Sequence, residues 1–483
     1  MSAAPARALT DVVESCVPAR LDRLPWSRWH VLILVALGTS WLLDGLEVTL
    51  VGSLAGVLES GQGLALRDQQ VAAAATVYLV GAVSGALFFG RLTDRLGRRK
   101  LFLVTLATYS LATLGTAFSS GYLTFCLARF FTGFGIGGEY AAINSAVDEL
   151  IPGKVRGTVD LIVNATFWIG ASIGSLAVLF LLGPDGPAPG LAWRLAFGVG
   201  GSLGLGVLLL RLMVPESPRW LMLRGRSAQA DEVLDDIEAR VSRTAGRLPP
   251  VAGAPLRLKT RDRTPWGEIA RTMLGENRPR CVLGLVLMVG QAFFFNAVFF
   301  TYGLVAKRFF GASDRALPLE LLPFAIASFL GPVILGPLFD RIGRKPMISL
   351  CYGLAGALLA VASVLFATGL LGARGLAILF SVIFFVASSA ASAAYLTVSE
   401  IFPLEIRAFA IALFYAAGTL IGGTGAPALF GVLIGSGERW AVAAGYLLGA
   451  LLMLAGARTE WRIGIEAAGR SLESVSKPLQ SVS

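Results

Sequence analysis

Twelve long apolar runs separated by polar connections constrain this chain more than any other feature of its sequence. A helix of about 20 residues crosses a hydrocarbon core of about 30 Å, and each run is close to that length. We therefore expect an all-α integral membrane protein with twelve transmembrane helices. They lie near residues 29–57, 71–92, 101–119, 121–147, 157–182, 195–213, 281–306, 318–339, 346–368, 375–399, 408–434 and 440–457.

The composition agrees with a membrane protein. Hydrophobic residues make up 55% of the chain and charged residues 15%, whereas a soluble protein carries about 25% charged residues. The 57 glycines suit helices that pack closely in lipid. We expect no metal site and no cofactor, because no metal or disulfide spacing relates the four cysteines, Cys16, Cys126, Cys281 and Cys351.

The membrane also accounts for the net charge of +10, so no nucleic-acid partner is needed. If both termini face the cytoplasm, most lysines and arginines fall in cytoplasmic segments and few in outer loops, as the positive-inside bias requires. Arg211 is one of the cations at the inner end of a run. We expect a multi-pass protein of the plasma membrane, which is the inner membrane in a bacterium, without a cleavable signal peptide.

A short charged stretch occurs twice between apolar runs, as Gly90–Lys100 and Gly336–Lys345, with the pattern G-x-x-x-D-R-x-G-R. A single copy is typical of a basic loop that orients helices. The second copy indicates two structurally equivalent halves, as in transporters built from repeats. A second pattern, E-x6-R, is repeated in the same way, from Glu149 to Arg156 and from Glu400 to Arg407.

These paired motifs resemble the loops between helices 2 and 3, and between helices 8 and 9, of the major facilitator superfamily. Pro215-Glu216-Ser217-Pro218-Arg219 resembles the motif that closes the first half in its sugar-porter branch. Gly469–Glu473 resembles the end of that branch's last signature, without its Pro-Glu-Thr opening. The resemblance covers about residues 25–475 and implies a monomeric transporter that works by alternating access.

The resemblance also implies a division of the chain. We expect a cytoplasmic tail at 1–28, a six-helix half at 29–213, a cytoplasmic linker at 214–280, a second half at 281–457 and a tail at 458–483. In the linker, Ser227 can cap a helix whose apolar stripe begins at Ala230 and ends at Val241. This helix either lies against the cytoplasmic ends of the bundle or docks a partner.

Charged residues at the cytoplasmic ends of the runs are, by the resemblance, an inner gate that closes in the outward-facing state. The alternative is that they only orient the helices, but the repetition of the acids favours a gate. The ten residues are Asp94, Arg95, Arg98, Glu149, Arg156, Asp340, Arg341, Arg344, Glu400 and Arg407.

A few charges lie inside the runs, where each is costly and therefore a candidate for function. Asp44 and Glu47 are three residues apart on one helix face, and neighbouring carboxylates repel as anions, which favours proton binding. Arg129 lies at a similar depth and can pair with a carboxylate or with an anionic substrate. The alternative is an ion pair that only locks two helices together. By the resemblance, Glu47 and Arg129 match the acid and the arginine of proton-coupled sugar porters, and Asp44–Glu47 is similar to the D-G-x-D motif of aromatic-acid symporters.

Glu139 lies ten residues beyond Arg129, about 15 Å along a helix, so it cannot share that site. It resembles the glutamate of the G-G-E-W stretch in metabolite symporters and is a second proton candidate; the alternative is a structural hydrogen-bonding role. Four further residues match substrate-binding positions of sugar porters: Asn164, Gln291, Asn296 and Tyr395. Ala165 replaces the glutamine that would follow Asn164, which argues against a hexose. Phenylalanines between Phe293 and Phe300 could form an aromatic wall; the alternative is that they face lipid or pack in the bundle.

The expected function is proton-coupled symport of a small organic acid, such as an aromatic or pyridine carboxylate. The alternatives are an exporter of drugs or organic cations, a sugar porter, and a nutrient sensor that binds without transport. An enzyme is not expected, because the sequence shows no nucleotide loop, metal cluster or paired nucleophile and base.

Overall fold

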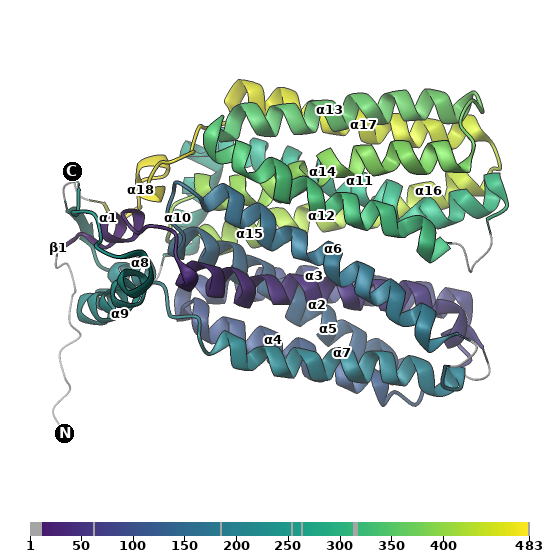
Figure 1. Ribbon diagram of the computed structural model, residues 1–483, viewed down its shortest axis with the longest axis horizontal. Coiled ribbons are helices and arrows are strands. Elements are labelled where there is room, and N and C mark those ends of the chain that lie inside the picture. Colours follow the sequence, from purple (N-terminus) through teal and green to yellow (C-terminus); the bar gives the residue numbers. More distant parts are fainter. Residues whose placement is uncertain are drawn as a thin grey trace.

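The computed structural model describes residues 12–60, 63–183, 186–252, 255–261, 264–312 and 317–481. It is a helical bundle of two halves that lie side by side (Figure 1). The first eleven residues of the expected N-terminal tail lie outside the described residues.

Each predicted apolar run is helical, and its ends lie within six residues of the expected bounds. The first half contains α2 (Arg28–Glu59), α3 (Asp68–Leu96), α4 (Arg98–Ala117), α5 (Tyr122–Leu150), α6 (Arg156–Leu181) and α7 (Pro189–Arg211). The second half contains α11 (Arg278–Phe310), α12 (Leu317–Arg341), α13 (Arg344–Ala367), α14 (Ala373–Ile401), α15 (Arg407–Gly418), the π-helical η2 (Thr419–Thr424), α16 (Gly425–Gly435) and α17 (Arg439–Ile463). The run at 408–434 thus forms three consecutive helical segments.

Eleven helices are long and apolar enough to cross a membrane by length and composition, within the part of the chain that the structure describes. The expected span at 121–147 is not among them. Its helix α5 carries four charged residues, Arg129, Glu139, Asp148 and Glu149, and several glycines. Every side chain from residue 135 to residue 150 is buried, so this half of α5 lies inside the protein rather than against lipid.

Glycines bring the helices that carry the candidate site into close contact. A Cβ at Gly133 or Gly137 of α5 would overlap the backbone of Tyr78 or Ala82 on α3, and one at Gly45 of α2 would overlap the backbone of α6. Small residues at such crossings are typical of helices that associate in lipid. They set the rotation and depth of α2 and α5, and hence which buried charges meet.

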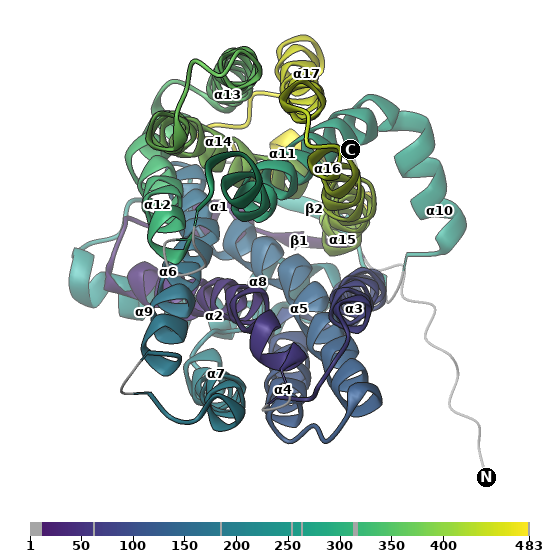
Figure 2. The ribbon, with the colours of Figure 1, turned by 90° about the vertical axis from the view of Figure 1, so that its right-hand side faces the viewer.

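The two halves contact each other through two pairs of helices. End-on, the first half lies below and the second above, with α6 beside α12 and α3 beside α15 (Figure 2). Helix α14 also contacts α5 and α6. The two contacts are equivalent: in each, the second helix of one half lies beside the fifth helix of the other.

One end of the bundle, here called the terminal end, carries the elements near both ends of the described chain and those of the linker (Figure 1). They are β1 (Val12–Ser15), α1 (Val17–Asp22), α8 (Pro218–Leu223), α9 (Ser227–Ala245), β2 (Leu256–Lys259), α10 (Trp266–Arg271), η1 (Thr272–Glu276) and α18 (Leu472–Val475). Strands β1 and β2 pair antiparallel, and Lys259 N–H donates to Gln480 O at 2.9 Å. Three distant segments of the chain therefore meet there.

The helix predicted in the linker is α9. Ala230 and Val241 lie on its buried stripe, and it packs against α1, α8 and α2. It begins at Ser227 itself, so the prediction that Ser227 caps it is wrong: Arg226 precedes the helix and makes no side-chain cap.

Candidate functional site

The predicted pairing of α2 with α5 is present as a buried ion pair between Glu47 and Arg129. Arg129 Nη1 donates to Glu47 Oε1, and the guanidinium lies 4.6 Å from the centre of the Tyr78 ring. Glu47 is 0% exposed and Arg129 2%. Among the described residues, Glu47 Oε2 and Arg129 Nε have no hydrogen-bond partner. The pair is thus desolvated without being fully satisfied, which makes it sensitive to a proton or to a competing anion.

Asp44 lies one helical turn from Glu47 but has different partners. Its carboxylate accepts hydrogen bonds from the phenol of Tyr140 and, at 3.4 Å, from that of Tyr78. It forms no ion pair within the described part of the chain. The carboxylate is therefore held by neutral donors, in contrast to that of Glu47.

Aromatic rings from both halves surround Asp44. The Tyr140 ring stacks on Trp41 of α2 at 4.5 Å and meets Tyr415 of α15 edge-on at 4.6 Å. Tyr395 of α14, a predicted substrate residue, lies edge-on to Trp41 at 5.5 Å. An aromatic wall thus joins the two halves beside the acids.

A second aromatic cluster also crosses between the halves. Trp168 of α6 lies 5.4 Å from Phe295, 5.0 Å from Phe299 and 6.4 Å from Phe384 of α14, between ring centres. Phe300, by contrast, is 45% exposed. Some phenylalanines of α11 therefore pack where the two halves meet, and others lie on the outer surface.

Glu139 forms its own ion pair, as its distance from Arg129 requires. Arg211 Nη2, at the end of α7, lies 2.7 Å from Glu139 Oε1 and also donates to Ser40 Oγ of α2. Arg211 is fully buried, with its guanidinium 4.8 Å from the Phe102 ring centre. The sequence shows Arg211 only as a cation at a helix end, where positive-inside residues are common, so this partner of Glu139 was missed.

Three other predicted substrate residues make different contacts. The Asn164 amide donates to Asn144 Oδ1 at 3.2 Å and to Asp160 Oδ2 at 3.3 Å. Gln291 Nε2 lies 3.9 Å from Met288 Sδ, and Asn296 Nδ2 donates to Ala292 O at 2.8 Å. The last two contacts lie within α11, so they tie neither side chain to the acids of the first half.

Two carboxylates of the predicted gate each cap a helix of the opposite half. Asp94 of α3 accepts from the N–H groups of Ala408 (3.2 Å) and Phe409 (3.0 Å) in the first turn of α15. Asp340 of α12 accepts from those of Gly157 (3.1 Å) and Thr158 (2.7 Å) in the first turn of α6. Carboxylates are favourable at these unpaired N–H groups and at the positive end of the helix dipole.

Four buried arginines contact the glutamates of the E-x6-R motifs, and two of them, Arg98 and Arg344, also contact Asp94 and Asp340. Arg98 contacts Glu149 at 2.7 Å and Arg344 contacts Glu400 at 3.1 Å, each within one half. Between the halves, Arg156 lies 3.4 Å from Glu400. Arg407 lies 3.7 Å from Glu149, also between the halves. Together these contacts join both halves at the terminal end.

The structure does not bring the predicted gate residues Arg95 and Arg341 into these contacts. Both are exposed and lie outside the network described above. Each follows a gate aspartate directly, so it points about 100° away from it around the helix.

Two glutamates cap equivalent helices, one in each half, and the sequence did not reveal either cap. Glu216 accepts from the N–H groups of Arg98 (2.8 Å) and Arg99 (3.3 Å), and Glu466 accepts from those of Arg344 (2.8 Å) and Lys345 (3.3 Å). Burial raises the pKa of Glu216, against the backbone bonds that it accepts. Of the Pro-Glu-Thr opening of the last signature, only the glutamate is present, as Glu466.

The two motifs that resemble sugar-porter signatures meet at the terminal end. Arg219 Nη1 lies 2.5 Å from Glu473 Oε1, and Arg219 Nη2 lies 3.0 Å from Asp22 Oδ1. Although burial favours its neutral form, the Arg219 guanidinium holds the pKa of Glu473 below its usual range. The N-terminal segment, the linker and the C-terminal segment are thus joined by charge.

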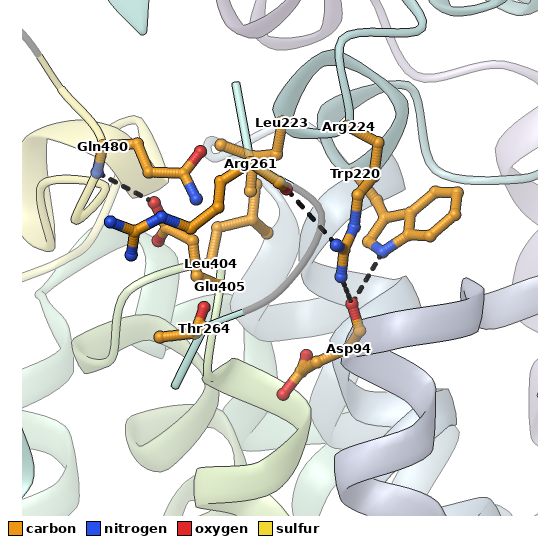
Figure 3. A pocket seen from close by; sticks show the side chains of 9 residues that line it. All are labelled: Asp94, Trp220, Leu223, Arg224, Arg261, Thr264, Leu404, Glu405 and Gln480. Atoms are coloured by element: carbon orange, nitrogen blue, oxygen red, sulfur yellow. Dashed lines mark hydrogen bonds between the residues drawn. The ribbon is translucent and has the colours of Figure 1, made fainter. Parts of the chain in front are cut away.

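A small pocket beside Asp94 is lined by residues of the linker, the C-terminal segment and both halves (Figure 3). Trp220 Nε1 donates to the backbone carbonyl of Asp94 at 3.0 Å, and Gln480 N–H donates to Glu405 Oε1 at 3.1 Å. Burial raises the pKa of Glu405 to about 7, so this carboxyl titrates near neutrality.

Known proteins resemble the chain, some over about half of its length and others over most of it. The family described as "Sugar (and other) transporter" matches residues 36–477. The niacin transporter NiaP of Acinetobacter baylyi is 32% identical over 46% of this chain and 48% of its own length. The gallate transporter of Pseudomonas putida is 27% identical over 70% of this chain and 71% of its own. The chain spans about half the length of the first curated relatives it matches.

Solved structures agree on the fold. The proton:xylose symporter XylE of E. coli, bound to 6-bromo-6-deoxy-D-glucose, has a TM-score of 0.73 at 21% identity. The match covers 93% of this chain and 98% of that one. It confirms the predicted major facilitator fold of two six-helix halves.

Proposed function

Because the chain belongs to the sugar (and other) transporter family, we propose that it moves a small metabolite across a membrane as a secondary active transporter. Members of such a family carry solutes rather than transform them, in line with the expectation that the chain is not an enzyme. We also propose that the protein lies in a plasma membrane with its terminal end on the cytoplasmic side, because of the positive-inside bias.

The proposed reaction is symport of a proton with a small organic carboxylate, and the buried Glu47–Arg129 pair carries this proposal. While Glu47 is ionised, it occupies the guanidinium of Arg129. A proton on Glu47 removes that charge and leaves Arg129 as a buried cation without a partner. A substrate carboxylate can then bind the guanidinium in the bidentate geometry that arginine favours. Proton and substrate therefore bind together and leave together.

The aromatic walls support a substrate with a flat ring. Trp41, Tyr140 and Tyr395 lie beside the acids, and rings pack well against such faces. The relatives named for niacin and gallate would carry a pyridine or benzene carboxylate, which has this shape and charge. A sugar is less suited, because two of the polar side chains expected to bind it, Gln291 and Asn296, bond within their own helix.

The gate proposal rests on the contacts between the halves at the terminal end. Asp94 and Asp340 cap helices of the opposite half, and Arg156 and Arg407 pair across the halves. All of these contacts must break before the terminal end can open. We assign them to an inner gate that is closed in this conformation.

Export of an organic cation is the second candidate. Asp44 favours it, because this buried carboxylate is held by two phenols and forms no ion pair in the described part of the chain. A cationic substrate would replace the phenols as its partner.

Uptake into proteoliposomes tests these proposals. The panel is labelled nicotinate, gallate, a quaternary ammonium compound and xylose, each with and without an inward proton gradient. We expect the gradient to drive accumulation of a carboxylate. Gradient-driven extrusion of the cation would favour the exporter, and binding without flux of any compound would indicate a sensor.

A further inference from the structure

Two buried carboxylates at the terminal end form none of the ion pairs and helix caps described so far. Asp148 of α5 and Asp160 of α6 are both 0% exposed. Among the described residues, neither oxygen of Asp148 has a hydrogen-bond partner, and Oδ1 of Asp160 has none either. Asp160 Oδ2 accepts a hydrogen bond from the Asn164 amide at 3.3 Å.

Charged groups on α6, α13, α14 and α15 lie near these acids. Asp148 lies near Glu400 of α14, Arg156 of α6 and Arg407 of α15. Ser399 also lies beside Asp148, but its hydroxyl donates to Leu396 O at 2.9 Å.

Asp160 lies near Asp148 itself and near Glu400, which are both acids, and near Arg344 of α13 and Arg156. Arg219 of α8, which lies further out, is paired with Asp22 and Glu473. The two aspartates thus share their surroundings with each other and with a gate glutamate.

The charges of the gate are already balanced without them. Each gate arginine forms an ion pair with a gate acid; the arginines are Arg98, Arg156, Arg344 and Arg407, and the acids are Asp94, Glu149, Asp340 and Glu400. Asp148 and Asp160 are therefore surplus acids. Ionised carboxylates that are buried near each other and near a third acid are strongly disfavoured, so the arrangement favours at least one bound proton.

The position of the two aspartates couples this proton to the gate. Both lie on helices of the first half, whereas α14, which carries Glu400 and Ser399 against them, belongs to the second half. Separation of the halves at the terminal end would remove that cover and admit water. The carboxylates could then ionise.

We infer that Asp148 and Asp160 form a proton-binding site of the closed gate, which releases its proton when the terminal end opens. This inference rests on the proposed gate and on a transport cycle, but it is separate from the coupling role of Glu47. Because the closed state binds the proton more tightly, acid favours the closed gate and alkali favours the open one, by linkage.

Distance measurements between two spin labels test the inference without any substrate. The labels are placed on cysteines at Lys100 and Ile342, which are exposed at the terminal end on opposite halves. The four native cysteines are replaced by serine, and the full chain is studied in lipid nanodiscs from about pH 5 to pH 9. We expect the population with a long distance to rise several-fold with pH.

The variants assign that response. Asp148→Asn and Asp160→Asn should each reduce the pH-dependent rise, and the double variant should remove it and stay closed. Asp148→Glu still carries a titratable carboxyl and should keep the pH-dependent rise. It is the control for a substitution that acts only by disturbing packing. Asp236→Asn, at an exposed position on α9, is the matched control and should behave as wild type.

Two results would overturn the inference. One is a wild-type distance distribution that does not change with pH. The other is a response that survives in the double variant but disappears in Glu47→Gln. A failure of the proposed symport would appear instead in the uptake assay, with the spin-label response intact.

Discussion

Arg129 of α5 donates a hydrogen bond to Glu47 of α2 from a position over the Tyr78 ring, with both charges buried in the first half. This relationship connects proton and substrate through one guanidinium. In the symport that we propose, proton binding at Glu47 frees Arg129 to bind the substrate carboxylate.

Arg129→Lys should weaken binding of the best carboxylate of the panel by about tenfold or more, although the charge is kept. An ammonium group is a point charge on a flexible stem and cannot reproduce the bidentate geometry. Equilibrium binding to purified protein measures the effect. Equal affinity in the two proteins would contradict carboxylate recognition by Arg129.

Glu47→Gln should abolish uphill accumulation but keep exchange of labelled for unlabelled solute. The glutamine imitates the protonated acid permanently, so the loaded carrier can still reorient but cannot release a proton. Asp44→Asn should have a milder effect, since it removes only a neighbouring negative charge and one of the two oxygens that accept hydrogen bonds from phenols. Accumulation by Glu47→Gln at the wild-type level would refute the assignment.

Arg211→Met should destabilise the protein by about 3–5 kcal/mol, because it leaves the Glu139 carboxylate buried without its cation. Adding Glu139→Gln should recover much of this loss. The two single variants and the double variant, compared by thermal unfolding in detergent, form the cycle that measures the coupling. Additive losses would mean that the pair is not energetically linked.

Asp94→Asn and Asp340→Asn should slow transport strongly while changing solute binding only a few-fold. Each loses a charged cap on a helix of the opposite half, worth about 0.5–2 kcal/mol, far from the Glu47–Arg129 pair. Arg95→Ala is the matched control, because Arg95 is exposed beside Asp94 but outside the network. Wild-type flux in both aspartate variants would reduce the repeated stretch to a loop that orients helices.

Glu405 should make stability depend on pH. Burial raises its pKa in the folded protein to about 7 from the ordinary 4.5, so the folded state binds the extra proton between these values. Stability is therefore full below about pH 4.5 and declines by up to about 3 kcal/mol as pH rises to about 7. The melting temperature of Glu405→Gln, followed over the same range, should lack this part of the decline. Parallel curves for the two proteins would exclude the effect.

The fold follows from local properties of the sequence. Lipid permits only helices of sufficient apolar length, so the twelve runs predicted the helices to within a few residues. The copies of the charged stretch at Gly90 and Gly336 predicted two equivalent halves, because each copy repeats with its neighbouring runs. The pairing of Glu47 with Arg129 could also be predicted, because depth in the membrane follows from residue counts along two helices.

The remaining partners were decided by tertiary structure. The pairing of Glu139 with Arg211, the caps made by Glu216 and Glu466 and the burial of Asp148 depend on how each helix is rotated. Glycine contacts between helices set that rotation, and the sequence spacing does not contain it. A charge at a helix end looks the same in sequence whether it faces headgroups, as an orienting cation does, or lies in the protein interior as Arg211 does. Only packing between distant segments distinguishes the two, because burial is a property of the assembled bundle.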